Sequence, residues 1–222
     1  MKNILKIVLC ASLIFCFQFS NQNVASAQIT HSSQGNLDEN ATAALKKAAK
    51  KFNTVSFKVK MTALDSQKKE VSSQQADVCY AAGKYRLAIP GQEIISDGTT
   101  IWHWNKDAKE VTVSNVSSTD DIDLMNPSRL LANYEKAFRP KYIRTEDDGT
   151  AVIDMQPRSA RSYHKIRLFV NEKNGTLKRM EVHKFDSSRE IYVLSNHSYS
   201  RPSGSFVFKT EEHPGVEVID MR

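Results

Sequence analysis

Apolar and polar residues alternate along most of this chain, as they do in a pleated strand with one buried face. The stretch VSFKVKM, residues 55–61, has an apolar residue at every second position, with serine or lysine between. The same pattern predicts further strands at residues 71–81, 84–89, 99–104, 110–116, 142–145, 151–156, 165–170, 176–185, 191–197 and 205–209. About ten short strands joined by tight turns such as Asp97-Gly98 and Asn174-Gly175 favour one large antiparallel sheet, curled or closed.

Two stretches follow helical spacing instead. Apolar residues recur at that spacing through residues 37–52, which predicts an amphipathic helix at the start of the domain. A second helix is predicted at residues 128–138, directly after the Asn126-Pro127 pair, which suits a helix start. Its apolar face consists of Leu130, Leu131, Tyr134 and Phe138. We expect this helix to cover the concave side of the curled sheet.

The segment ISDGTTIWHW, residues 95–104, contains both tryptophans of the chain. In a strand, Trp102 and Trp104 point to one face and His103 points to the other. Because residues 84–89 divide in the same way into apolar and charged sets, we expect the tryptophans on the apolar inner face of the sheet. Helices could fill that inner side, or they could leave a hollow lined by aromatic side chains for an apolar ligand. Periodicity does not distinguish these two interpretations.

The N-terminal residues have the pattern of a cleaved export signal. Lys2 and Lys6 precede an apolar stretch, and Ala25-Ser26-Ala27 provides small residues at a cleavage site. The apolar run is too short for the roughly 20 residues of a membrane span. We therefore expect a signal peptide at residues 1–27, a flexible leader at 28–36 and a single soluble domain at 37–222 that is exported.

Composition narrows the possible functions. Removing residues 1–27 leaves Cys79 as the only cysteine, so no internal disulfide is expected, and the histidines show no metal-ligand spacing. The net charge of +6 includes Lys2 and Lys6, and export excludes most nucleic-acid roles. Nucleotide-binding, hydrolase and metalloprotease motifs are missing from the sequence. We expect a protein that is not an enzyme, that uses no cofactor or metal and that is a monomer.

Two groups of polar residues have simple structural explanations. His103 lies next to the tryptophans, but a lone histidine on the polar face of a strand is far more often a surface residue than a catalytic one. Asp120, Asp121 and Asp123 precede the second predicted helix, where stabilisation of the helix dipole explains them better than a metal site or an acid pair.

Three segments resemble the LolA-type outer-membrane lipoprotein carrier proteins. ISDGTTIWHWNKDAKEVTV at residues 95–113 is similar to the signature region of that family, and NPSRLL at 126–131 is similar to its lid segment. FVFKTEEHPGVEVID at 206–220 resembles its closing segment, in which a Pro-Gly-Val strand follows a Phe-x-Phe pair. The segments occur in the family's order and span nearly all of the exported chain.

The resemblance implies an open, incomplete antiparallel β-barrel with an N-terminal helix and a helical lid over a hydrophobic concave face. It also implies a carrier that takes acylated lipoproteins from an inner-membrane ABC transporter complex to an outer-membrane acceptor. With the strand pattern, it predicts an acyl-chain cavity lined by Phe57, Val59, Met61, Tyr85, Leu87, Ile89, Trp102 and Trp104. The predicted lid residues, which would fill the empty cavity, are Leu124, Met125, Leu130, Leu131, Tyr134 and Phe138.

One departure from the family pattern and one alternative function remain. Family members often carry an Arg-Pro pair near the start of the third strand that ties barrel to lid, but this chain has Ala81-Ala82-Gly83-Lys84 there. Arg86 lies in the opposite register of the strand from Tyr85, so the role is not transferred to it. The alternative is a periplasmic sensor or binding module that uses the same fold for a protein, a peptide or another lipid.

Overall fold

Residues 38–116, 127–202 and 204–222 are described by the computed structural model. The predicted signal peptide and leader lie outside these residues, as do Leu124, Met125 and the three aspartates that precede the second helix. Within the described residues, no helix combines the length and the apolar character that crossing a membrane requires.

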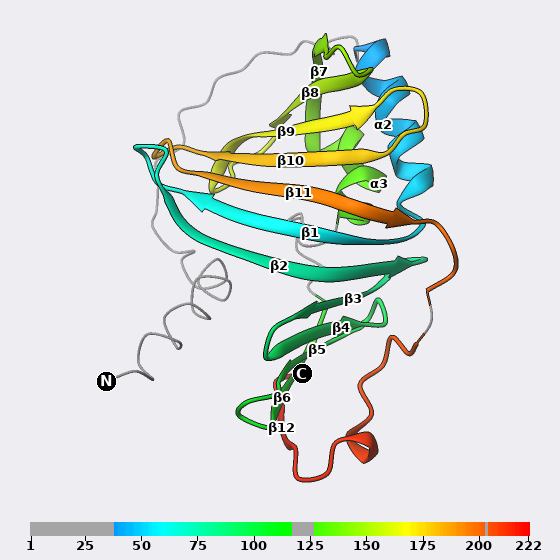
Figure 1. Ribbon diagram of the computed structural model, residues 1–222, viewed down its shortest axis with the longest axis vertical. Helices are drawn as coiled ribbons and strands as arrows, with labels where there is room; N and C mark the ends of the chain where they lie inside the picture. Colours follow the sequence, from blue (N-terminus) through cyan, green and yellow to red (C-terminus); the bar gives the residue numbers. More distant parts are fainter. Residues whose placement is uncertain (1–37, 117–126, 203) are drawn as a thin grey trace. The chain divides into compact units, whose positions relative to one another are not determined.

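The described strands form one open sheet of twelve strands, in the order β12-β6-β5-β4-β3-β2-β1-β11-β10-β9-β8-β7 (Figure 1). Neighbouring strands pair antiparallel, except that β12 pairs parallel to β6. The predicted large, open and mainly antiparallel sheet is confirmed. The strands are β1 (Thr54–Leu64), β2 (Glu70–Ala81), β3 (Lys84–Ile89), β4 (Gln92–Ser96), β5 (Thr100–Asn105), β6 (Glu110–Asn115), β7 (Phe138–Thr145), β8 (Thr150–Pro157), β9 (Tyr163–Asn171), β10 (Leu177–Lys184), β11 (Arg189–Ser198) and β12 (Glu217–Asp220).

Three predictions about strands were wrong. The alternation rule missed β4 because both of its faces are partly covered: Ile95 and Ser96 are adjacent and both are buried. It predicted a strand at 205–209, where Ser205 Oγ instead bonds the backbone N–H and C=O of Val207, at 3.1 Å each. A short 3₁₀ helix, η2 (Thr210–Glu212), follows this segment. The rule also missed the last strand, β12, because this edge strand is exposed throughout and has no alternation of buried and exposed residues.

Helix α2 (Glu39–Lys51) is capped at its N-terminus and packs closely on the sheet. Asp38 caps its N-terminus, with one carboxylate oxygen accepting from Ala41 N at 3.1 Å and the other from Tyr142 N of β7 at 2.8 Å. Its buried residues are mainly alanines, which allows close packing on β7, β8 and β9. Gly175, in the β9–β10 turn with φ +74°, lies so close to the helix that an added Cβ would sit 2.7 Å from the Lys47 carbonyl carbon. The first predicted helix is confirmed.

Helix α3 (Pro127–Ala137) packs against α2 and β7. It ends one residue before Phe138, which was expected on the apolar face of this helix but begins β7 instead. The side chain of Phe138 is fully buried. The predicted helix is therefore confirmed, and the placement of Phe138 in it was wrong.

We call the face of the sheet that meets Phe52, at the end of α2, the inner face, and the opposite face the outer face. Phe52 contacts Phe57 of β1 and Tyr80 of β2, with ring centroids 5.7 and 6.2 Å apart. Cross-strand pairing continues this face through Met61, Tyr192, Met180, Leu168 and Ile153. Most of the large side chains of β8, β9 and β10 that are less than 2% exposed lie on it, so the main core is on the inner side.

Candidate apolar binding site

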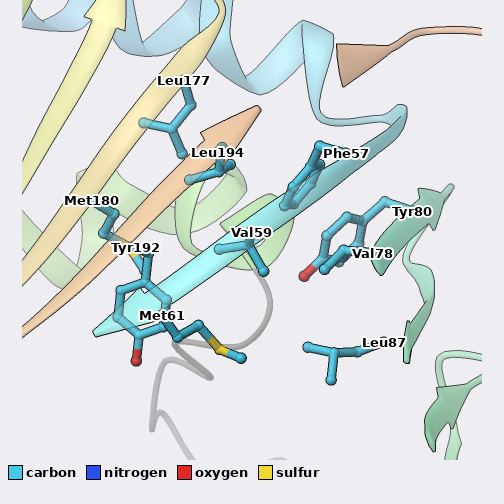
Figure 2. A pocket seen from close by; sticks show the side chains of 10 residues that line it. All are labelled: Phe57, Val59, Met61, Val78, Tyr80, Leu87, Leu177, Met180, Tyr192 and Leu194. Carbon is cyan, nitrogen blue, oxygen red and sulfur yellow. The ribbon is translucent and has the colours of Figure 1, made fainter. Parts of the chain in front are cut away.

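A hollow lies on the inner face, over the middle strands of the sheet (Figure 2). Its walls come entirely from strands: β1, β2, β3, β10 and β11. The lining is almost wholly apolar. The lining residues are Phe57, Val59, Met61, Val78, Tyr80, Leu87, Leu177, Met180, Tyr192 and Leu194.

Strand register brings these residues together. Met61 of β1 lies opposite Tyr192 of β11, and Val59 lies opposite Leu194. On the other side of β1, Phe57 lies opposite Val78 of β2. Val78 in turn lies opposite Leu87 of β3. Residues opposite one another in a sheet point to the same face, so alternate positions of neighbouring strands form one continuous apolar wall.

The hollow is small as it stands. Its cavity volume is about 30 Å³, which leaves room for only about two water molecules. This is far below the roughly 300–1,000 Å³ of pockets that hold a drug-sized ligand. Met61 and Met180 are unbranched and can change rotamer at low cost. A bulky ligand would enter by displacing side chains.

Polar atoms of the lining side chains are confined to two tyrosine hydroxyls, those of Tyr80 and Tyr192. Tyr192 Oη donates to Glu190 Oε2 at 2.8 Å, and Glu190 Oε1 lies 2.6 Å from Lys184 Nζ. Figure 2 shows the Tyr192 hydroxyl pointing away from Leu177 and Leu194, at the Met61 end of the hollow. One end of an otherwise apolar hollow therefore carries charged groups.

The opposite end of the hollow is aromatic. Phe57 stacks on Tyr80 with a centroid distance of 6.1 Å and on His197 with one of 5.8 Å. His197 Nε2 donates to the Leu177 carbonyl oxygen at 3.0 Å, which fixes the position of its ring. Burial lowers the pKa of His197, so the neutral ring is favoured.

The structure brings together only part of the predicted cavity. Phe57, Val59, Met61 and Leu87 line the hollow. Tyr85 and Ile89 are buried on the same face of β3, next to the hollow but outside its lining. The prediction missed six lining residues, although all six lie on strands that were predicted. These residues are Val78, Tyr80, Leu177, Met180, Tyr192 and Leu194.

The expectation that Trp102 and Trp104 share the inner face was wrong. In the register of β3 and β4, Leu87 lies opposite Ile94, and Ile94 lies opposite His103 of β5. His103 is therefore on the inner face, and the tryptophans on either side of it are on the outer face. Sequence alternation shows which residues of one strand share a face, but pairing between strands decides which face that is.

On the outer face, the tryptophans belong to a second apolar cluster. Its buried members are Ile95, Val111 and Phe208, and Trp102, Trp104 and Val216 pack against them. Trp104 contacts Phe208 with a centroid distance of 5.4 Å and His213 with one of 4.0 Å. Phe208, His213 and Val216 all come from the segment after β11, which runs back to the β6 edge (Figure 1). The chain thus covers its own tryptophans.

His103 was expected on the polar surface of the sheet, but it is half-buried on the inner face. Its Nε2 atom lies 3.0 Å from Gln92 Oε1 on β4. Burial lowers its pKa, and the nearby Glu110 opposes this effect. Groups of three or more His, Cys, Asp or Glu that could hold a metal ion are not found among the described residues.

The described lid residues are buried but do not line the hollow. Leu130 and Leu131 are each 1% exposed, on a helix that contacts α2 and β7. Tyr134 is also buried, and its hydroxyl donates to Glu135 Oε1 at 3.0 Å. Burial, together with this carboxylate, raises the pKa of Tyr134 to about 12. In this conformation, α3 completes the packing around α2, and its role as a lid remains a prediction.

Comparison with known families decides the relationship. The family model described as outer membrane lipoprotein carrier protein LolA matches residues 88–210, more than half of the chain. The chain belongs to the LolA family. The matched region begins in β3 and includes β10 and β11, so it covers the tryptophan strand and four of the ten residues that line the hollow.

Individual relatives extend the LolA match beyond this region. An outer-membrane lipoprotein carrier protein of Coxiella burnetii is 25% identical over 98% of this chain and 99% of its own length. One from Haemophilus influenzae is 31% identical over 59% of this chain and 60% of its own length. A crystal structure of an uncharacterized conserved protein from Thermus thermophilus shares the fold, with a TM-score of 0.53, 8% identity and coverage of 81% of this chain and 98% of that one. Family membership supports a lipoprotein carrier role.

Proposed function

We propose that this protein is a periplasmic carrier that holds the acyl chains of lipoproteins in the inner-face hollow and moves them from the inner to the outer membrane. The observation that carries the proposal is the apolar hollow, which lies on the inner face of the sheet of a LolA-family protein. In the carrier cycle, an inner-membrane ABC transporter complex donates the cargo and an outer-membrane acceptor receives it. The protein acts by binding and release, without catalysis.

The chain's organisation fits this role. We propose that a signal peptide at residues 1–27 is removed after export and that a leader at 28–36 precedes one domain at 37–222. The exported protein works in the periplasm, between the two membranes that the cargo must cross.

The energetics explain why the site is apolar and adaptable. Keeping one acyl chain of about 16 carbons in water costs on the order of 12 kcal/mol at roughly 0.8 kcal/mol per methylene, so a carrier must replace most of that hydration with apolar contact. It must also release the chain. A hollow that is nearly closed when empty moderates affinity, because part of the binding free energy is used to open it. We place the opening step at α3, whose Leu130 and Leu131 would leave their packing as the cargo enters.

Photocrosslinking in cells tests the proposal. A photoreactive residue at position 87 faces the hollow, whereas one at position 104 faces the outer cluster. We expect acylated lipoprotein as the main adduct from position 87 and little from position 104. A non-acylated protein or peptide as the main adduct from position 87 would favour the sensor, and equal labelling from both positions would contradict the site.

Binding assays with purified variants give a second test. Met61→Glu places a charge in the hollow, and Met61→Trp fills it without one, so both variants should lose palmitoyl-lipopeptide binding. The matched control is Val193→Glu, because Val193 lies 43% exposed on the outer face of β11. Retained binding in the folded Met61→Trp protein would place the acyl site elsewhere.

A further inference from the structure

The charged end of the hollow is built from two adjacent strands. Glu190 lies two residues before Tyr192 on β11, so the two side chains point to the same face. Pairing confirms this, because Glu190 lies opposite Val182 of β10, while Tyr192 lies opposite Met180. Lys184 lies two residues beyond Val182 and reaches Glu190 across the strands, with 2.6 Å between Nζ and Oε1. The ion pair therefore lies on the inner face, next to Tyr192 of the lining but outside the lining itself.

The Lys184–Glu190 pair is partly buried, as several other ion pairs of the sheet are, but it lies beside the hollow. The side chain of Glu190 is 20% exposed and that of Lys184 is 31% exposed. A charged pair at the edge of an apolar hollow loses hydration, and the loss must be compensated by hydrogen bonds. Tyr192 donates one of these hydrogen bonds to Glu190, and the ring of the same tyrosine lines the hollow. The arrangement presents a cationic donor and an anionic acceptor side by side.

We propose that Lys184 and Glu190 form a head-group subsite that binds the amide group by which an acyl chain is joined to its carrier molecule. An amide offers one N–H donor and one C=O acceptor, which match the Glu190 carboxylate and the Lys184 ammonium, respectively. The acyl chain then extends past Tyr192 into the hollow. This inference rests on the proposed function and deepens it, because it assigns a chemical class to the polar end of the ligand.

The subsite distinguishes an acyl amide from a free fatty acid. The carboxylate of palmitate has no N–H to donate, and its negative charge would lie beside Glu190. N-palmitoylglycinamide carries the same acyl chain on a neutral head with both hydrogen-bonding groups. The two ligands share the same acyl chain, so the difference in affinity comes from their head groups. The palmitate carboxylate gives Glu190 no hydrogen bond and is repelled by its charge.

Equilibrium titration of N-palmitoylglycinamide and of palmitate, on the wild-type protein and folded variants, tests this subsite. We expect Glu190→Met to weaken amide binding by about tenfold, the effect of losing one hydrogen bond to a charged group, and to strengthen palmitate binding. Glu190→Gln keeps an acceptor oxygen but removes the charge, so it should strengthen palmitate binding while changing amide binding by less than about threefold. Lys184→Met should weaken binding of both ligands.

The control is Lys165→Met. Lys165 pairs with Asp154 at 3.2 Å between Nζ and Oδ2, and it lies on the outer face, so its loss should change neither affinity. If Glu190→Met changes both affinities in the same direction, or neither, the head-group subsite is wrong while the acyl site stands. If the wild-type protein binds neither ligand, the proposed function falls and the subsite falls with it.

Discussion

Two apolar regions lie on opposite faces of the same sheet, and among the described residues only the outer one is covered by another segment of the chain. On the outer face, Trp102 and Trp104 are covered by Phe208, His213 and Val216 from the C-terminal segment. On the inner face, the strands around Val59 and Leu87 enclose a hollow. Both tryptophans are therefore in the filled region. The hollow is lined by valine, leucine, methionine, phenylalanine and tyrosine.

This difference shows that large aromatic residues are a poor marker of a ligand site. An indole ring has a large apolar surface, and a chain with a spare segment can cover it intramolecularly. The C-terminal segment is held on the sheet by backbone hydrogen bonds, from Glu217 N to Lys109 O and from Met221 N to Val113 O, both 2.8 Å long. The hollow lies where the described chain supplies no such cover, and that is where a ligand has room.

The largest expected effect follows from truncating the filled region. Phe208→Ala removes a ring that is 6% exposed and that contacts Trp104 and His213. We expect a loss of about 3–4 kcal/mol in the free energy of unfolding, measured by denaturant titration, together with a red shift of tryptophan emission. Acyl-lipopeptide affinity, measured on the folded fraction, should stay unchanged. A loss of affinity without a loss of stability would mean that the outer cluster belongs to the ligand site.

Truncation in the hollow should behave differently. Leu87→Ala removes a side chain that is 3% exposed but has the hollow on one side, so it loses fewer contacts than a fully packed leucine. We expect a cost of about 2 kcal/mol, at the lower end of Leu→Ala substitutions. The hollow becomes larger, so acyl-lipopeptide affinity should rise. An unfolding cost equal to that of Phe208→Ala, with no gain in affinity, would indicate that the inner face is as tightly filled as the outer one.

Much of the sheet could be predicted from the sequence because most strands bury one face and expose the other. The pattern of β1, from Val55 to Met61, follows the observed burial closely. The prediction did not find which face of the sheet each residue of β5 occupies, because β4 lies between β3 and β5 and was missed. Pro90-Gly91 was expected as a turn, but assigning a strand directly after it, at residues 92–96, would have paired β4 with β3 and shifted the assignment of Trp102.

The hollow itself could not be predicted, because an empty space has no sequence pattern. Alternation indicates that Val78 and Leu194 face inward, but it does not say whether another side chain meets them there. That depends on which strands the helices cover, and α2 contacts β7, β8 and β9, while the lining comes from the strands beyond them. The choice of Trp102 and Trp104 as lining residues followed from alternation within their strand and from the family resemblance, and neither shows which face of the sheet carries the hollow.

A smaller effect is expected from acidification, because His197 stacks on Phe57 at the edge of the hollow. Burial lowers its folded-state pKa below the unfolded value, so the unfolded state binds more protons than the folded state as pH falls. Stability is therefore present above the unfolded histidine pKa of about 6.5 and is lost progressively as pH falls toward the folded pKa.

The test is to compare unfolding free energies at pH 7.5 and pH 5.5 in the wild type and in His197→Gln, whose amide can still donate to the Leu177 carbonyl. The variant should lose part of the pH dependence, and the remainder belongs to His103 and His183, whose pKa values burial also lowers. An unchanged pH dependence would show that the pKa of His197 is the same in the folded and unfolded states, which contradicts the effect of burial.

The smallest expected effect is the sharpest test of the comparison between the two faces. Both tryptophans of the chain lie in the outer cluster, where they are only partly buried and contact Ile95, Val111 and Phe208. A ligand that fills the inner-face hollow contacts neither indole ring, because the backbone of the sheet separates the two sites. Saturation with an acyl lipopeptide should therefore leave the tryptophan emission maximum in place, although the same titration followed by a labelled ligand shows binding. A strong blue shift that saturates with ligand would place hydrocarbon against the indoles and would reverse the assignment of the two faces.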